Sequence, residues 1–241
     1  MRFRVRGLLC SALVAAAVSA GAGSASATSL SGWSLAADFR VAPDQANPNP
    51  DSLGNPGVWH FLESASLAHA PAGYGLFPEF IDDRFNLLGL ESWQSNIGDD
   101  PTDRLPTDSF NARADNPFPF GIDWPPGTVL VHPLPNELVV VGWQSPISGA
   151  VQVSGDVIDR HSACGDGIDW SVDKGASTLA SGVIPNGGGE SFASGAGAAK
   201  LGHISVSVGT FLYFVVGPGP NGDHGCDSTG LEVTITAKKH V

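Results

Sequence analysis

Apolar and polar residues alternate with a period of two along much of the chain after Thr128. Successive side chains of a β-strand point to opposite faces, so each alternating run predicts a strand with one row in a core and one row in solvent. The apolar rows of four such runs are Val151 and Val153; Ile168, Trp170 and Val172; Ile204, Val206 and Val208; and Leu231, Val233 and Ile235.

A fifth segment, Leu138 to Trp143, is almost entirely apolar, which predicts a strand buried on both faces. Turn residues separate the runs, among them Asn186-Gly187 and residues 217–222. Short strands at this spacing indicate an all-β fold, an antiparallel β-sandwich that is jelly-roll-like. The chain shows no strand–helix alternation, which argues against an α/β fold.

The N-terminal half, residues 28–127, is irregular by comparison. Proline and asparagine cluster at Asn47-Pro48-Asn49-Pro50, and residues 98–116 are polar and rich in Asp and Pro, so both stretches predict long loops. Two complete sheets need strands from this half, and the best candidates are Trp33–Val41 and Trp59–Leu62. We therefore expect one β-sandwich domain over residues 28–241.

The first residues have the pattern of a secretory signal peptide. Three arginines precede an apolar stretch from Leu8 to Ala20, and Ala25-Ser26-Ala27 forms a cleavage site, so residues 1–27 are expected to be removed. The apolar stretch is shorter than the roughly 20 residues of a spanning helix, and no later segment is long enough either. We expect a secreted, extracellular protein without a membrane span after cleavage.

The charge of the chain narrows the classes of partner. It has 12 basic and 24 acidic residues; removal of residues 1–27 takes away three arginines and no acid, so the mature net charge is −15. Nucleic acids and anionic lipids need positive charge on the protein, so neither is expected as a partner. The excess of carboxylates leaves ligands available for divalent cations.

Two cysteines remain after Cys10 leaves with the signal peptide. Cys164 and Cys226 form an even pair in an oxidising compartment, which predicts a disulfide. Its loop of about 60 residues would stabilise the fold by roughly 4 kcal/mol in the chain-entropy model. A reactive thiol or a metal site is the alternative, although no CxxC spacing supports a zinc site.

Aspartates flank both cysteines in sequence. Asp166 and Asp169 follow Cys164, and Asp223 and Asp227 bracket Cys226, so a disulfide would bring four carboxylates together. Their repulsion needs a cation or hydrogen bonds to offset it. One interpretation is a structural Ca²⁺ site completed by backbone carbonyls of the glycine-rich loops. The alternative is that the aspartates cap turns by bonding their own loop amides, with no cofactor at all.

Six tryptophans are candidates for stacking on sugar rings. Trp143 and Trp170 lie within strand patterns and are expected in the core, where aromatic rings bury large areas. Trp93 and Trp124 lie in loop-like sequence, so we expect them to be exposed and assign them a ligand-binding role. Core packing of these two is the alternative.

Motifs of established catalytic classes are not found: the chain lacks GxSxG, HExxH, a P-loop and a Rossmann fingerprint. His132, in a His-Pro pair, is a candidate base, but a turn-forming or hydrogen-bonded histidine is the simpler interpretation. His161 and His224 lie near the cysteines and could join a metal site. No catalytic residue is assigned.

Three stretches of the chain resemble a known kind of module. They are "DFRVAPDQANPNPDSLGNPGVWHF", "VLVHPLPNELVVVGWQSPISGAVQVSGDV" and the segment from "GDGIDWSV" to "VGTFLYFVVGPGPNGDHGCDSTGLEVTIT". The chain resembles the uncharacterised β-sandwich modules of secreted bacterial proteins of the PEP-CTERM and planctomycete exported type. It departs from them in its two cysteines and its Asp/Pro-rich middle. The resemblance implies a galactose-binding-like jelly roll and no established activity.

Three functions are compatible with these observations. The first is non-catalytic binding of extracellular polysaccharide or cell-wall glycan. The second is a surface-associated structural protein that contacts a cell-surface protein and has no small-molecule ligand. The third is a β-sandwich hydrolase acting on glycosides, which would need two carboxylates about 5 to 10 Å apart.

Overall fold

The structure is a computed structural model that describes residues 31–39, 46–96, 98, 100–101, 103–118 and 121–238. The predicted signal peptide, residues 1–27, lies outside the described residues. Within them, no helix has both the length and the apolar character that crossing a membrane requires.

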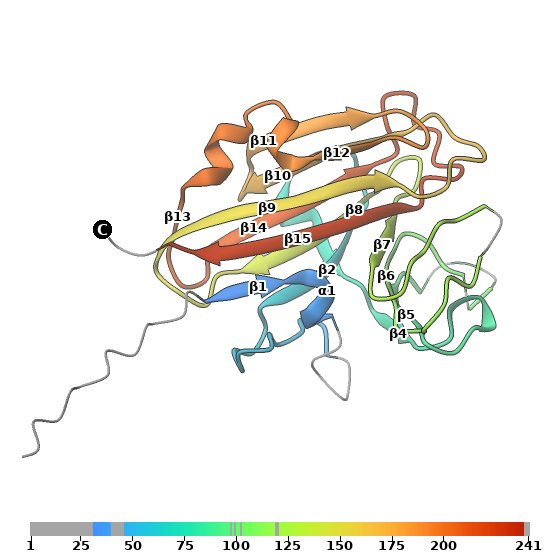
Figure 1. Cartoon of the computed structure of the whole chain (residues 1–241), viewed down its shortest axis with the longest axis horizontal. Helices are drawn as coiled ribbons and strands as arrows, with labels where there is room; N and C mark the ends of the chain where they lie inside the picture. The colour runs from blue at the N-terminus through green and yellow to red at the C-terminus, as the bar shows by residue number, and fades with distance from the viewer. Residues whose placement is uncertain are drawn as a thin grey trace, which may run out of the picture.

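Two antiparallel sheets pack face to face as a sandwich (Figure 1). We call the larger one sheet A. Its strands are β1 (Gly32–Ser34), β4 (Glu79–Ile81), β5 (Leu90–Gln94), β6 (Thr107–Asn111), β7 (Val129–His132), β9 (Gly149–Asp159), β12 (Gly189–Ser191), β13 (Ile204–Val206) and β15 (Thr229–Ala237). Their order is β12-β9-β15-β7-β6-β5-β4, with β1 beside β15 and β13 beside β9.

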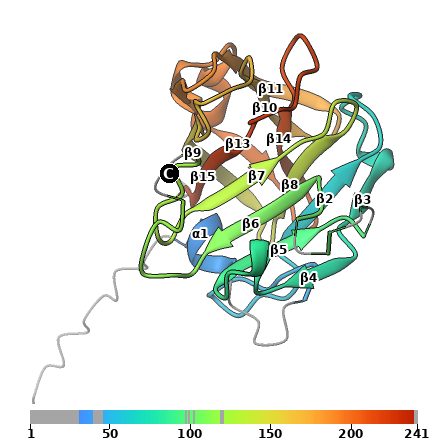
Figure 2. The same cartoon turned by 90° about the vertical axis from the view of Figure 1, so that its right-hand side faces the viewer.

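The second sheet, sheet B, has the order β11-β10-β14-β8-β2-β3. Its strands are β2 (Trp59–Ser64), β3 (Tyr74–Leu76), β8 (Leu138–Gln144), β10 (Ile168–Lys174), β11 (Ser177–Ile184) and β14 (Phe211–Gly217). The helices are short: α1 (Leu35–Asp38), η1 (Pro71–Gly73), η2 (Arg84–Asn86), η3 (Phe192–Ser194) and η4 (Ala198–Gly202). Both halves of the chain thus contribute strands to both sheets, as Figure 2 shows from the end where β4, β5 and β6 lie.

The core between the sheets contains the apolar rows that the alternation predicts. The predicted rows on β9, β10 and β15 are buried, and the rings of Trp33 and Trp143 meet edge to face at 5.1 Å. Val208 is the exception, because it is 69% exposed. Strand β13 ends at Val206, and the turn closed by the hydrogen bond from Thr210 N to Ser207 O (2.9 Å) carries Val208 into solvent.

Strand β8 is buried on both faces, as its apolar sequence predicts. Val139, Val141 and Trp143 enter the core between the sheets. Leu138 and Val140 face outward and belong to a separate apolar cluster on the outer side of sheet B. These outward-facing apolar side chains therefore need other residues to shield them from solvent on the outer side of sheet B.

Two predictions for the N-terminal half are wrong in part. Of the expected strand Trp33–Val41, residues 40 and 41 lie outside the described residues, and in the part up to Phe39 the strand covers only Gly32–Ser34. The Ser34 hydroxyl then accepts a bond from Ala37 N and caps helix α1. The expected loop over residues 98–116 contains strand β6, whose five residues are all buried although four are polar. A buried polar strand has no hydrophobic period, so the pattern could not reveal it. Strand β2, in contrast, confirms the prediction over Trp59–Leu62.

The Asn-Pro cluster is a set of fixed contacts rather than a free loop. The side-chain amide of Asn47 donates to Phe61 O (2.8 Å) and Phe77 O (3.1 Å), and that of Asn49 donates to Phe39 O (2.7 Å). These bonds fasten the cluster to the backbone of three buried phenylalanines.

Asp51, directly after this cluster, is a buried acceptor for four donors. Its carboxylate accepts the indole N–H of Trp33 at 2.6 Å, the backbone N–H of Leu53 at 3.0 Å, and both the backbone and side-chain N–H groups of Asn55 at 2.7 Å. The carboxylate of Asp38 likewise accepts the indole N–H of Trp59 at 2.9 Å and the backbone N–H of Ser52 at 3.0 Å. The two carboxylates tie the loop to the tryptophans of the core.

We expect Asp51→Ala to lower the free energy of unfolding by about 2–4 kcal/mol, because it leaves the buried indole N–H of Trp33 and three partly buried N–H groups without this acceptor. Urea unfolding of residues 28–241 measures this. Asp82→Ala, at an exposed position, is the control and should change stability by less than about 0.5 kcal/mol. Equal stability of Asp51→Ala and the unsubstituted protein would contradict the role of this carboxylate.

Candidate functional site

A disulfide joins Cys164 and Cys226, as the sequence predicts, with their Cα atoms 5.5 Å apart. It links the connection between β9 and β10 to the connection between β14 and β15. His161 lies within 4.8 Å of both sulfurs. Because the sulfurs are bonded to each other, they offer no thiolates, and this group does not form a cysteine-ligated metal site.

The linked loops bring together the four aspartates that flank the cysteines. Asp227 is fully buried, and the charges of Asp159, Asp166, Asp223 and Asp169 act on it. Burial is the largest cause and these neighbouring carboxylates add to it, so that the pKa of Asp227 rises to about 8. The sequence analysis did not identify Asp159, the last residue of β9, as a member of this group.

Three carboxylates of this group accept backbone N–H groups. Asp159 accepts His161 N (2.9 Å) and Gly187 N (2.8 Å), Asp169 accepts Gly219 N (3.0 Å), and Asp223 accepts Gly225 N (2.9 Å). Turn capping, the alternative from sequence, therefore describes Asp223, whose partner lies two residues away, whereas the N–H group that Asp169 accepts belongs to the opposite loop. Turn capping does not describe Asp227, because neither of its carboxylate oxygens has a hydrogen-bond partner among the described residues.

The exposure predicted for Trp93 and Trp124 is wrong. Trp93 is 5% exposed and points from β5 into the core, where its ring stacks on Phe61 at 6.3 Å. Trp124 is 1% exposed and forms a small second core with Leu90 and Leu130 on the outer side of sheet A. Both lie beyond the reach of a ligand in solvent.

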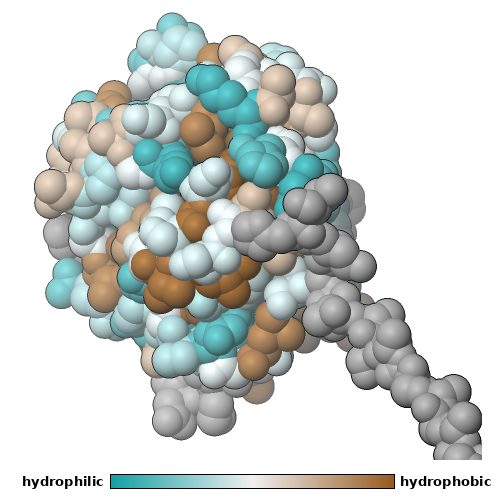
Figure 3. Space-filling view, turned by 90° about the vertical axis from the view of Figure 1, so that its left-hand side faces the viewer, coloured by the Kyte–Doolittle hydropathy of each residue, from teal (hydrophilic) through white to brown (hydrophobic). Residues whose placement is uncertain are grey.

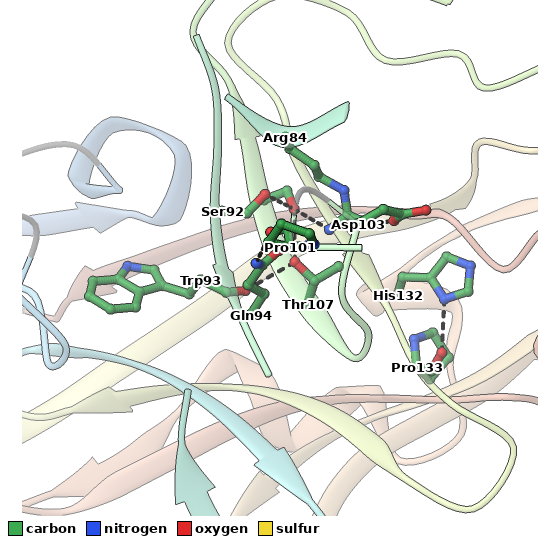
Figure 4. Close-up of polar contacts among 10 residues, drawn as sticks. Arg84, Ser92, Trp93, Gln94, Pro101, Asp103, Thr107, His132 and Pro133 are labelled. Atoms are coloured by element: carbon green, nitrogen blue, oxygen red, sulfur yellow. Dashed lines mark hydrogen bonds and ion pairs between the residues drawn. The ribbon is translucent and has the colours of Figure 1, made fainter. Parts of the chain in front are cut away.

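A buried polar network fixes loops onto the outer side of β5 and β6 (Figure 4). Arg84 donates to Ser109 Oγ at 3.1 Å and to Asp103 Oδ1 at 2.9 Å, and Gln94 donates to the carbonyl oxygen of Pro101 at 2.7 Å. Ser92 and Ser109 share a hydrogen bond of 2.6 Å. The residues of this network are hydrogen-bonded to one another, so the network has a structural role.

His132 lies beside this network and fits the structural interpretation made from its sequence. Its Nδ1 lies 2.8 Å from Pro133 O (Figure 4). Burial, and then the positive charge of Arg84, lower its pKa to about 4, with smaller contributions from the neighbouring histidines. The ring is neutral at pH 7, and the structure gives it no carboxylate partner among the described residues.

The outer side of sheet B carries a chain of aromatic rings, which we call the aromatic face: His60, Tyr74, Phe211 and Tyr213. His60 and Phe211 meet edge to face at 4.8 Å, Phe211 and Tyr213 stack at 5.3 Å, and Tyr74 meets Tyr213 at 5.1 Å. His60, Tyr74 and Phe211 are partly exposed. This face combines ring surfaces that are reachable from solvent with rigid strands below them.

Gly142 of β8 lies in the middle of the aromatic face. A Cβ atom there would come within 3.4 Å of Leu62, His60 and Tyr213 side-chain atoms. The glycine therefore lets the neighbouring rings approach one another over the strand. Its partners in the ladders are His60 on β2 and Tyr213 on β14.

The connection between β2 and β3 crosses the outer side of sheet B. His69 in this connection contacts β10, where its Nδ1 lies 2.7 Å from Asp173 Oδ2 and 3.2 Å from Ser171 Oγ. Asp173 is fully buried, and its hydrogen bond is the main cause that raises the pKa of His69. Burial, with Asp173 next, raises the pKa of Tyr74. Tyr74, which directly follows this connection, packs on the outward apolar cluster that includes Leu138 and Val140.

Two pockets flank the aromatic face. The first, of about 470 Å³, lies beside His69 and is lined by polar groups that include Asp169, Ser171 and Ser181. The second, of about 310 Å³, is lined in part by Gln144 and Val208. Figure 3 looks onto the end of the sandwich near the second pocket and shows apolar residues grouped among hydrophilic ones.

No protein-family model matches the chain, and no curated protein matches it in sequence. Several solved structures are similar in fold, with low scores. The CBM51 of Clostridium perfringens GH95, solved with methyl-galactose, is 10% identical over 46% of this chain and 69% of its own length, with a TM-score of 0.32. The GH26-CBM35 β-(1,4)-mannanase of Podospora anserina is 12% identical over 53% of this chain and 24% of its own, with a TM-score of 0.30.

A cyclase from Fischerella sp. TAU is 9% identical over 87% of this chain and all of its own, with a TM-score of 0.31. These neighbours carry different activities at similar TM-scores. A function for this chain has to be argued from its own surface.

The contact between His69 and Asp173 predicts a pH-dependent contribution to stability. Because the folded-state pKa of His69 is raised, its contribution is fully present below the unfolded pKa and is lost as the pH rises through the folded pKa. We expect His69→Gln to be less stable than the unsubstituted protein at pH 5 by at most about 1 kcal/mol, because His69 is partly exposed.

The difference should shrink by pH 9, and urea unfolding across this range measures it. Asp169 and Tyr74 also face this contact, and both are unchanged in the comparison. A difference that grows with pH would refute the assignment.

Proposed function

We propose that the protein is a secreted, non-catalytic module that binds extracellular polysaccharide on the aromatic face of sheet B. The observation that carries the proposal is the run of partly exposed rings, His60, Phe211 and Tyr74, between two pockets. Pyranose rings have apolar faces that stack on aromatic side chains, and binding sites combine such surfaces with a few fixed polar groups. Rigid strands hold the rings in place, which limits the entropy lost on binding.

The polar groups around the rings favour a neutral glycan. Burial lowers the pKa of His60, which makes this ring neutral at pH 7, and Gln144 and Ser181 are uncharged. The full chain carries a net charge of −12. A polyanionic glycan would be repelled, so a neutral one is the better fit.

The extent of the face favours an oligosaccharide over a single sugar. His60, Tyr213 and Asp173 lie in one row across the ladders of β2, β8, β14 and β10. Three strand spacings correspond to about 14 Å. Several sugar units can therefore contact the face together, which suits a polymer.

Binding fits the pocket beside His69 better than glycoside hydrolysis does. Its lining contains one carboxylate, that of Asp169. Asp173 is four residues further along β10, so that the two Cα atoms are about 13 Å apart, and it is buried beneath His69. Glycosidases hold their two carboxyl groups about 5 to 10 Å apart across the substrate.

A second candidate function is contact with a cell-surface protein. Leu67 and Leu76, on and beside the connection that covers sheet B, are 47% and 42% exposed. Exposed leucines suit contact with a protein better than contact with a glycan. The experiment below separates the two functions, since a protein-binding surface would leave all polysaccharides unbound.

The test is a pull-down of the mature protein on insoluble neutral polysaccharides (cellulose, xylan, mannan and galactan), with alginate as the polyanionic comparison. We expect one or more neutral polymers to retain the protein and alginate not to retain it. Phe211→Ala and Gln144→Ala should each weaken binding about tenfold, which corresponds to about 1.4 kcal/mol. Leu88→Ala, at an exposed site on the β5 side of sheet A, is the control and should bind as before.

Circular dichroism verifies that each variant is folded, and Gln144→Ala still tests the face if Phe211→Ala is destabilised. The proposal fails if no polysaccharide is retained. It also fails if folded Phe211→Ala and Gln144→Ala both bind as tightly as Leu88→Ala.

A further inference from the structure

We infer that Asp227 and Asp166 bind a calcium ion between the two loops that the disulfide links. Asp227 is fully buried, and both of its carboxylate oxygens lack a hydrogen-bond partner within the described part of the chain. The same holds for Oδ1 of Asp166. Three buried acceptor atoms on two facing loops therefore lack a donor, which is costly unless an ion is there.

The surroundings of Asp227 contain negative charge that needs compensation. Asp159, Asp166, Asp169 and Asp223 all act on it in the same direction as burial. Hydrogen bonds to loop amides account for Asp159, Asp169 and Asp223, as described above. A divalent cation would remove the remaining repulsion and allow Asp227 to be ionised at neutral pH.

The backbone between the loops is shaped for close approach. Gly165 has a φ of +89°, and a Cβ atom there would clash with the carbonyl oxygen of Gly225 and come within 3.3 Å of Asp227 Oδ1. Glycine thus allows a backbone carbonyl and a buried carboxylate oxygen to converge on one point. Carbonyl and carboxylate oxygens are the ligands that calcium takes.

The donor set favours calcium over a transition metal. The two nearby sulfurs are locked in the disulfide, and the free acceptors of Asp166 and Asp227 are oxygens. Zinc prefers sulfur and imidazole ligands, whereas hard cations prefer oxygen. Magnesium demands a near-ideal octahedron, so loops of irregular geometry fit calcium better.

An ion at this position would stabilise the junction between the two sheets. Asp166 precedes β10 of sheet B, and Asp227 precedes β15 of sheet A. The ion would thus add a second link beside the disulfide. The inference does not depend on glycan binding, because the ligands lie outside the aromatic face.

The test is calorimetric titration of chelator-stripped mature protein with CaCl₂, and with MgCl₂ for comparison, together with Tm measured in EDTA and in 10 mM calcium. We expect one calcium per chain with a Kd of about 10⁻⁴ to 10⁻³ M, typical of extracellular modules. Calcium should raise Tm by roughly 3–10 °C, and magnesium should do so less.

Variants separate this site from nonspecific ion effects. Asp227→Asn, nearly equal in shape, should abolish the calcium response; in EDTA it should be at least as stable as the unsubstituted protein, because the amide stays uncharged beside the neighbouring carboxylates at every pH. Asp166→Asn should weaken calcium binding at least tenfold. Asp82→Asn, exposed and outside the linked loops, is the matched control and should respond fully.

The inference is overturned if the unsubstituted protein neither binds calcium in the titration nor changes its Tm. It is also overturned if Asp227→Asn or Asp166→Asn responds as Asp82→Asn does. If one variant fails to fold, the other variant and the titration of the unsubstituted protein decide. Loss of polysaccharide binding with an intact calcium response would refute only the proposed function.

Discussion

A tryptophan buried between two sheets brings its indole N–H into a region without water, and that donor needs an acceptor there. For three of the core tryptophans a carboxylate supplies it: Asp51 for Trp33, Asp38 for Trp59 and Glu190 for Trp170. The indole N–H groups of Trp93 and Trp143 have no hydrogen-bond partner among the described residues. Each carboxylate belongs to a short or irregular segment rather than to a central strand. The irregular segments are therefore part of the packed core, and the sandwich depends on them.

The outer side of sheet B also depends on residues outside its central strands. Strand β8 presents apolar side chains in both directions, so its outer side needs a cover. Tyr74 and Phe211 of the aromatic face supply this cover and stay partly exposed, and beside them His69 fastens the connection between β2 and β3 to Asp173. A surface that is half covered and half accessible, with rings set on rigid strands, is suited to a flat, neutral ligand.

The sequence predicted those features that have a period or a local chemical signal. The inward rows on β9, β10 and β15 followed from alternation, and the disulfide followed from an even number of cysteines. Strand β6 and the burial of Trp93 were not predictable in this way, because the buried polar residues of β6 hide the strand next to β5. Phe211 and His60 were missed because they become neighbours only across paired strands.

The contacts of Asn47, Asn49 and Asp51 have a consequence for how the protein tolerates change. A proline- and asparagine-rich segment would ordinarily accept insertions and substitutions freely, since such stretches lie at the surface. Here the segment forms hydrogen bonds with buried aromatic residues. A substitution in it would therefore also disturb the packing of the core. In the course of evolution this stretch should drift as slowly as the strands it connects.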